Sequence, residues 1–502
     1  MTLVTSAASW YFKGRLGRIK RSIEHPDVVQ QEQLASLIKS AGKTAFGRKH
    51  GFDSIINYND FAGRVPLQDY ETLKIFINRM RQGEPDLLWP GQVRWFAKSS
   101  GTTSNKSKFI PVTTQALHQC HYKGARDVLA FFFSNIEKSK LFQGKSLIMG
   151  GSTSVLGEKT LSGDLSSILL INSPLMGRFF SAISTSVSLL NDWEEKLEVV
   201  ATKTMHQNVT SLSGVPSWNL LLLKKILEKS GKNTILDVWP NLELFIHGGV
   251  SFVPYREQFR RIIPSDRMRY LETFNASEGF FGIQNDFSTD DMLLMLDYGV
   301  FYEFVTLDQL NQENPKSLVL TEVEIGKPYA MIITTNGGLW RYYIGDTVEF
   351  TSLAPYKFKI SGRTASYINA FGEELMVYNT DKAFEFACQQ TGALICEYTA
   401  GPVFLDGNSA AAHEYVVEFE KLPPNLHEFT AIFDAKIKDL NSDYEAKRTS
   451  ELLLKMPVIK CAPKGTFFNW MRKRGKVGGQ NKVPRLSNNR LIIEDLLSFM
   501  NN

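Results

Sequence analysis

The chain has 502 residues, of which 43% are hydrophobic and 22% are charged, and its formal net charge is +5. These proportions exclude a disordered chain, and the length favours two or three globular domains over one core. No apolar run is long enough to cross a bilayer, and no signal peptide is visible. The four cysteines form no C-x-x-C pair, which is typical of a reducing compartment. We therefore expect a cytoplasmic protein without a membrane partner.

The positive charge is concentrated near the C-terminal end. Residues 452–493 contain ten Lys and Arg and no Asp or Glu, so the rest of the chain carries −5. Such a tract is typical of binding to nucleic acid, an anionic membrane surface or a phosphate-rich ligand, and also of a solvated basic face. Because no signature of a nucleic-acid-binding fold accompanies it, we expect no nucleic-acid partner.

The first half of the chain alternates predicted helices and strands. Apolar residues at spacings of three and four predict helices, and short β-branched or apolar runs predict strands. The expected helices are 28–46, 70–81, 114–133, 193–205 and 217–227, and the expected strands are 93–97, 146–150 and 242–246.

The second half begins with strands and ends in a smaller α+β unit. Strands are expected at 269–275, 300–305, 331–335, 339–344 and 358–360, with a turn at Asn275-Ala276, a hairpin turn at Asn336-Gly337-Gly338 and a strand end at Gly345-Asp346. From about Gly372 the pattern becomes helix 381–390, strand 415–420 and helix 429–442. The predicted fold is α/β, with a large N-terminal domain over 1–370 and a small α+β C-terminal domain over 371–502.

A stretch of small residues, Ser99 to Thr103, is followed by Lys106 and Lys108. Small residues allow backbone N–H groups to point into one concavity, and the lysines add positive charge, which together are typical of a phosphate-binding loop. The same composition also occurs in ordinary surface loops. A P-loop requires a second glycine before the lysine, and Asn105 stands there instead. The stretch is more similar to the phosphate loop of adenylate-forming enzymes, with Lys108 as its closing lysine.

A second group of candidate ligands is His118, Cys120 and His121 on the helix that follows. No fourth metal ligand is near them in the sequence, and histidines on helices are commonly polar or packed residues. We therefore expect no metal there.

Three short motifs follow one another along the chain, and each ends a predicted strand: Ser99-Ser-Gly-Thr-Thr103, Phe274-Asn-Ala-Ser-Glu278 and Tyr342-Tyr-Ile-Gly-Asp346. Their order resembles the acyl-acid amido synthetase (Gretchen Hagen) family of adenylate-forming enzymes. Three further segments support the resemblance: Trp239-Pro-Asn241, Gly337-Gly-Leu-Trp-Arg-Tyr342 and Gln480-Asn-Lys-Val-Pro-Arg485. The chain departs from the family pattern at Asn105, Phe274, Tyr343, Asn481 and Val483.

The resemblance implies an ATP-dependent ligase. A carboxylic acid reacts with ATP to give an acyl-adenylate and pyrophosphate, and an amine, usually an amino acid, then displaces AMP. Fixed N–H groups, lysines and Mg²⁺ are expected where charge grows on the phosphates. The implied phosphate-binding residues are Ser99, Ser100, Gly101, Thr102, Thr103 and Lys108.

Other roles are implied residue by residue. Glu278 is expected to bind Mg²⁺, with Ser277 beside it, and Asp346 is expected to accept the ribose hydroxyls. Lys482, on the C-terminal domain, is expected to swing in and neutralise the phosphates through a hinge between Arg363 and Asn379. The residues expected at the adenine or ribose are Gly248, Gly249, Phe274 and Arg363.

Other functions remain open on the sequence. An acyl-CoA or acyl-carrier ligase uses the same adenylation step, and a non-catalytic nucleotide-binding protein would keep the motifs without the reaction. The expected partners are a small carboxylic acid and an amine. The sequence leaves the identity of both, and the oligomeric state, undecided.

Overall fold

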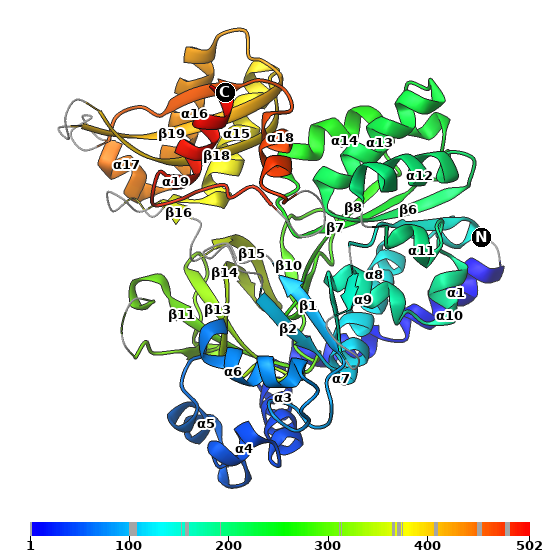
Figure 1. The fold of residues 1–502 in the computed structure, drawn as a ribbon, viewed down its shortest axis with the longest axis vertical. Helices are drawn as coiled ribbons and strands as arrows, with labels where there is room; N and C mark the ends of the chain where they lie inside the picture. The colour runs from blue at the N-terminus through cyan, green and yellow to red at the C-terminus, as the bar shows by residue number, and fades with distance from the viewer. Residues whose placement is uncertain are drawn as a thin grey trace. The chain divides into compact units, whose positions relative to one another are not determined.

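The computed structural model describes residues 3–501 except for 100–107, 152, 156–159, 191, 311, 313, 364–366, 369–372, 374, 406–409, 449–453 and 477–481. The chain forms two compact units (Figure 1). The first consists of residues 1–249, 262–344 and 348–359, and the second of residues 250–261, 345–347 and 360–502. The two units are described separately below.

The first unit is built on a large mixed sheet. Its strand order is β12-β11-β13-β14-β15-β10-β9-β8-β7-β6-β3. Strands β3, β6, β7 and β8 are parallel, whereas β8, β9 and β10 are joined antiparallel. The bounds are β3 Lys145–Ile148, β6 Val209–Gly214, β7 Leu244–Gly248, β8 Arg269–Ala276, β9 Gly279–Ile283, β10 Met292–Leu294, β11 Val300–Thr306, β12 Leu318–Val319, β13 Pro328–Thr335, β14 Tyr342–Leu353 and β15 Tyr356–Arg363.

The first unit also contains a smaller sheet of four strands. Its order is β2-β1-β5-β4, with β1 antiparallel to β2 and parallel to β5. The bounds are β1 Trp95–Ser99, β2 Lys108–Val112, β4 Thr153–Val155 and β5 Leu161–Gly163.

Helices cover the large sheet because its central strands are apolar on both faces. Helix α13 packs on β6 (Figure 1), α8 packs on β9, and α3 packs on β11 and β13. The helices of the first unit are α1 Leu3–Lys13, α2 Leu16–Glu24, α3 Pro26–Ala41, α4 Ala45–Lys49, α5 Tyr58–Arg64, α6 Tyr70–Arg81, α7 Thr114–Ala116, α8 Tyr122–Asn135, α9 Leu165–Ile171, α10 Leu175–Phe179, α11 Thr185–Ser188, α12 Trp193–Thr204 and α13 Pro216–Ser230, with a π-helix at Leu117–His121.

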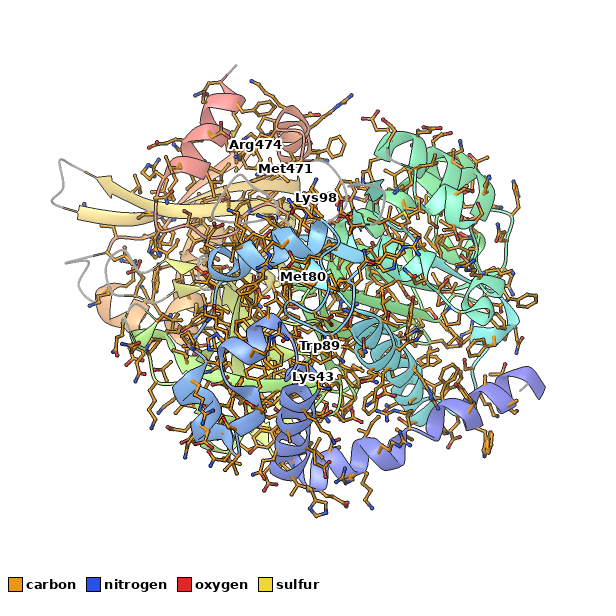
Figure 2. The ribbon with its side chains drawn as sticks, turned by 60° about the horizontal axis from the view of Figure 1, so that its bottom comes forward. Lys43, Met80, Trp89, Lys98, Met471 and Arg474 are labelled. Carbon is orange, nitrogen blue, oxygen red and sulfur yellow. The ribbon has the colours of Figure 1, made fainter. Side chains whose placement is uncertain are left out.

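An aromatic core holds the N-terminal helices to the sheet. Trp340 is fully buried, and its ring lies 4.7 Å from that of Phe52 and 6.3 Å from that of Trp89, which is labelled in Figure 2. The Trp340 Nε1 donates to the Leu88 carbonyl at 3.0 Å, so the buried indole is satisfied. This core fixes the start of β14, which carries the third motif.

The second unit has a three-stranded sheet, β18-β19-β20, in which β19 is antiparallel to β18 and parallel to β20. Its core contains Phe384, Tyr398, Tyr415 and Phe433, all of them buried. The bounds are α14 Arg256–Ile262, β16 Tyr367–Ile368, β17 Leu375–Met376, α15 Val377–Thr391, β18 Leu394–Leu405, β19 Ala410–Lys421, α16 Leu426–Leu440, α17 Ser442–Arg448, β20 Val458–Ala462, α18 Thr466–Lys473 and α19 Leu491–Met500. The α/β class and the α+β C-terminal part are as predicted.

Three local predictions are wrong. Gly345-Asp346 does not end a strand, because β14 continues to Leu353 between two neighbouring strands that pair with it. The turn after β8 is at Ser277-Glu278 rather than at Asn275-Ala276, since Ala276 pairs with Gly279. The predicted helix over 28–46 is also divided into α3 and α4.

Candidate active site

The two ends of the predicted phosphate loop lie opposite each other. In the β1–β2 hairpin Ser99 pairs with Lys108, so the first residue and the closing lysine of the motif share one register position. Ser100, Gly101, Thr102 and Thr103 lie outside the described residues, and their phosphate contacts stay a prediction.

The Lys108 end of this hairpin is attached to helix α6. The Phe109 backbone N–H donates to the Tyr70 hydroxyl at 3.0 Å, and the Lys108 Nζ lies 5.9 Å from the centre of the Tyr70 ring. Asp69 caps the helix by accepting from the Thr72 N–H at 2.8 Å, which fixes Tyr70 at its first turn. The closing lysine therefore has a defined position.

Glu278 occupies the tip of the β8–β9 hairpin. Ser277 and Glu278 are the two residues between the paired Ala276 and Gly279. Ser277 is buried, and its Oγ has no hydrogen-bond partner among the described residues. The turn therefore presents a carboxylate and a buried hydroxyl together, which is a donor set of oxygens suited to a hard cation.

Tyr342, the first residue of the third motif, connects these groups. Its side chain is fully buried, and its hydroxyl has no hydrogen-bond partner within the described part of the chain. Burial raises the pKa of Tyr342 well above its usual value, and the negative charge of Glu278 raises it further, followed by Tyr70. Gln68 forms a β-bridge with Tyr342, which places Tyr342 close to Tyr70 and, through the Tyr70 ring, to Lys108. Glu278 lies close enough to act electrostatically on Tyr342.

We predict that Tyr342→Phe lowers activity without lowering the stability of the protein. A buried hydroxyl without a partner costs about 1–3 kcal/mol, so its removal should leave the urea midpoint unchanged or raise it. If this hydroxyl serves the reactants, acid-dependent pyrophosphate exchange should fall about tenfold in the same variant.

Tyr302→Phe is the matched control. Tyr302 is also fully buried, but its hydroxyl donates to the Met295 carbonyl at 3.0 Å. That variant should lose about 1 kcal/mol of stability and keep its exchange activity. Equal losses of stability in both variants would show that Tyr342 is only a structural residue.

The glycine pair Gly248-Gly249 ends β7, parallel to β8, so it lies at the same sheet edge as the Glu278 turn. A Cβ on Gly248 would lie 2.3 Å from the Thr273 carbonyl oxygen, and Gly249 has a φ of +82°. Gly248 is therefore required for packing and Gly249 for its backbone conformation. Phe274, by contrast, is buried against Phe281 at a centroid distance of 5.0 Å, so its predicted adenine contact gains no support from its packing.

Asp346 is a buried residue of β14 and is 8% exposed. It belongs to the short stretch 345–347 of this strand that is part of the second unit. The next residue, Thr347, has its hydroxyl 2.9 Å from the Ser361 hydroxyl, near the end of β15 at Arg363. The ribose role of Asp346 and the role of Arg363 stay predictions.

Lys482 is half-buried and belongs to a segment fixed against β18. Arg485 forms ion pairs of 2.9 Å with both Asp381 and Glu397, and its backbone accepts from the Ala400 N–H at 2.8 Å. Burial alone would lower the pKa of Arg485, but Glu397 and Asp381 raise it well above its usual value. Arg485, three residues after Lys482, therefore anchors the segment that carries the lysine.

No group of three or more potential metal ligands drawn from His, Cys, Asp and Glu occurs among the described residues. His121 is buried, its Nδ1 lies 3.0 Å from the Asn275 Oδ1, and burial lowers its pKa to about 4. Cys120 is likewise buried, and burial raises its pKa to about 12. Both therefore pack beside the second motif as neutral groups.

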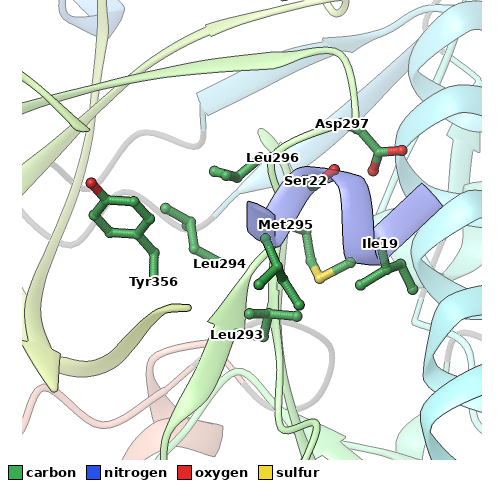
Figure 3. A pocket seen from close by; sticks show the side chains of 9 residues that line it. Ile19, Ser22, Leu293, Leu294, Met295, Leu296, Asp297 and Tyr356 are labelled. Atoms are coloured by element: carbon green, nitrogen blue, oxygen red, sulfur yellow. The ribbon is translucent and has the colours of Figure 1, made fainter. Parts of the chain in front are cut away.

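A small pocket elsewhere in the first unit lies between α2 and the chain that follows β10 (Figure 3). Its lining is mostly aliphatic. Its one carboxylate, Asp297, is held by ion pairs with Arg15 and Lys123. The pocket thus lacks a free charged group and is separate in composition from the candidate site.

Three positions were missed by sequence reasoning: Tyr70, Tyr342 as a buried hydroxyl, and Arg485 as an anchor. Tyr342 and Arg485 stand inside the quoted motifs, so the motifs themselves were a signal. Tyr70 carries no such signal, because only the fold brings α6 to the end of the phosphate loop.

Comparison with solved structures defines the class. The chain has the fold of an acyl acid amido synthetase, GH3.15, with a TM-score of 0.76 at 18% identity over 94% of this chain and 93% of that one. It also has the fold of a 2-hydroxyisobutyryl-CoA ligase solved in its postadenylation state with 2-HIB-AMP, with a TM-score of 0.57 at 12% identity over 95% and 92%. The fold is therefore that of the adenylate-forming ligases.

The chain belongs to the GH3 family. The GH3 N-terminal, central and C-terminal domains match residues 15–268, 293–363 and 378–491. Relatives include the indole-3-acetic acid-amido synthetases GH3.4 of Arabidopsis thaliana, 24% identical over 93% of this chain and 90% of its own length, and GH3.8 of Oryza sativa subsp. indica, 23% identical over 91% and 88%. The family predicted from the motifs is confirmed, and membership implies the use of ATP.

Proposed function

We propose that this chain is an ATP-dependent acyl-acid amido synthetase. A carboxylate oxygen of the acid attacks the α-phosphorus of ATP, the bond to the β-phosphate oxygen breaks, and pyrophosphate leaves. The amine nitrogen then attacks the acyl carbon, AMP leaves, and the nitrogen gives up a proton. The observation that carries the proposal is that Lys108 lies against Tyr70 and that Tyr342 is bridged to Gln68, two residues before Tyr70, in a chain that matches the GH3 domains over residues 15–268, 293–363 and 378–491.

Each group has a role that its chemistry supports. Lys108 offers positive charge to the phosphates, and the Tyr342 hydroxyl can donate to an oxygen that gains charge. Glu278, with the Ser277 hydroxyl, would hold Mg²⁺, which when bound neutralises charge on the phosphate oxygens. We assign Asp346 to the ribose, and Gly248 and Gly249 to the nucleotide edge of the sheet.

We predict that Lys482→Ala lowers pyrophosphate exchange by about 10²- to 10³-fold, the usual effect of removing one donor to a transition state. The segment stays anchored by Arg485, so the variant should fold normally. Lys464→Ala, at an exposed lysine of the same unit, is the control and should keep full exchange. Equal activity of the two variants would remove Lys482 from the reaction.

The acceptor assay tests the second half of the proposal. A panel of carboxylic acids is first screened by acid-dependent exchange of labelled pyrophosphate into ATP. The productive acid is then offered amino acids or coenzyme A. Amide with amino acids supports the proposal, thioester with coenzyme A supports an acyl-CoA ligase, and no exchange with any acid supports a non-catalytic nucleotide-binding protein.

We also propose that the enzyme works in the cytoplasm on small soluble substrates. All four cysteines are free, which suits a reducing compartment. No helix in the described part of the chain is long and apolar enough to cross a membrane.

A further inference from the structure

Helix α1 presents two of its three aromatic residues to solvent. Thr5 and Ser9 are buried, whereas Trp10 is 81% and Tyr11 53% exposed. Phe12 packs inward against Phe133 and Phe142, so the exposed Trp and Tyr depart from the usual rule that large apolar residues of a surface helix face the core. Large exposed apolar groups of this kind mark interaction surfaces.

The exposed rings of α1 are connected to a second exposed ring on α10. Phe12 contacts Tyr11 at a centroid distance of 5.2 Å and Phe142 at 5.9 Å. Phe180 contacts Phe142 at 4.9 Å and Phe179 at 5.3 Å. Phe179 is 69% exposed, so one continuous aromatic row joins the two helices, which lie near each other in Figure 1.

Cations border this row and no acid lies within it. The Arg126 guanidinium lies 4.5 Å from the centre of the Tyr11 ring, and the Lys145 Nζ lies 5.0 Å from that of Phe179. Lys13 and Arg178 add exposed positive charge on α1 and α10. Neither helix contains an Asp or Glu, nor does the short 3₁₀ segment Leu141–Gln143 that contacts α1.

We propose that this surface, which we call the aromatic-basic face, docks on an anionic lipid bilayer. Trp and Tyr flanked by Lys and Arg suit the headgroup region, where rings bury and cations meet lipid phosphates. A second copy of the chain fits less well, because a two-fold contact would bring like charges together without an acid to offset them. This proposal of peripheral contact replaces the expectation from the sequence that the protein has no membrane partner.

The test is co-sedimentation of the full chain with vesicles. Binding to vesicles that contain phosphatidylserine should exceed binding to pure phosphatidylcholine about tenfold, and added salt should weaken it. Trp10→Ser with Phe179→Ser, and separately Lys13→Glu with Lys145→Glu, should each lower the bound fraction about tenfold. Ile56→Ser, at an 88% exposed apolar residue outside the face, should bind like the unchanged protein.

Pyrophosphate exchange in each variant checks that the protein remains folded, since none of these residues belongs to the candidate active site. Three results would overturn the proposal. The first is equal binding to neutral and anionic vesicles, or no binding to either kind. The second is a dimer that Trp10→Ser dissociates, and the third is binding of single-stranded DNA that the Lys13→Glu, Lys145→Glu variant abolishes while vesicle binding persists.

Discussion

Glu278→Ala should abolish pyrophosphate exchange, with a loss of about 10³-fold or more. The carboxylate sits at the tip of the β8–β9 turn, beside the buried Ser277 hydroxyl and within electrostatic range of Tyr342. If it holds Mg²⁺, its removal leaves the charge on the phosphate oxygens without its counterion at the moment pyrophosphate departs. The measurement is exchange across a range of Mg²⁺ concentrations, together with ATP binding by calorimetry.

Two comparisons make this result specific to the metal. Glu278→Asp keeps the carboxylate on a shorter side chain, and its exchange should recover as Mg²⁺ is raised, whereas Glu278→Ala should not respond. Glu324→Ala, at a carboxylate that pairs with Lys327 on the surface, should behave like the unchanged protein. Near-normal exchange by Glu278→Ala would show that the metal assignment is wrong.

Local pattern predicted some elements closely and others not at all. The helix expected over 70–81 is α6, because Leu73, Ile77 and Met80 repeat on one buried face and Asp69 caps it. β14 was predicted to stop at Gly345, since glycine followed by Asp is typical of a turn. The strand continues because neighbours on both sides supply its backbone hydrogen bonds, which no local pattern reveals.

Some residues of the candidate site could likewise be proposed from local sequence, and others only from the fold. Lys108 and Glu278 could be proposed from the sequence because they stand in motifs whose residue types suit phosphate and metal. That Tyr70 holds the end of the phosphate loop depends on a hydrogen bond across 39 residues of chain. The unpartnered hydroxyl of Tyr342 is likewise a property of the packed interior, so it could be recognised only in three dimensions.

Arg341→Met should produce the largest loss of stability, about 3–5 kcal/mol in the unfolding of the first unit. Arg341 donates three hydrogen bonds to Glu303, at 2.8 Å, 3.0 Å and 3.1 Å, and Glu303 is fully buried. The same guanidinium donates to the carbonyls of Ala62 and Val65. Methionine replaces the volume but leaves a buried carboxylate without its cation, and breaking a buried pair from one side costs this amount. Urea unfolding followed by tryptophan fluorescence measures it.

The matched control is the exposed pair Arg21–Glu32, which is held by two hydrogen bonds and has both side chains about half exposed. Arg21→Met should change the urea midpoint far less than Arg341→Met, because water screens the exposed pair and solvates the carboxylate left behind. Arg341→Met combined with Glu303→Gln should recover part of the loss, since the unpaired charge is gone. Similar losses in Arg341→Met and Arg21→Met would mean that the Arg341 side chain fixes neither the buried carboxylate nor the start of β14. A much larger loss of stability in Arg341→Met than in Arg21→Met would support a positioning role for Arg341. Arg341, one residue before Tyr342, would then be the group through which the N-terminal helices position the third motif.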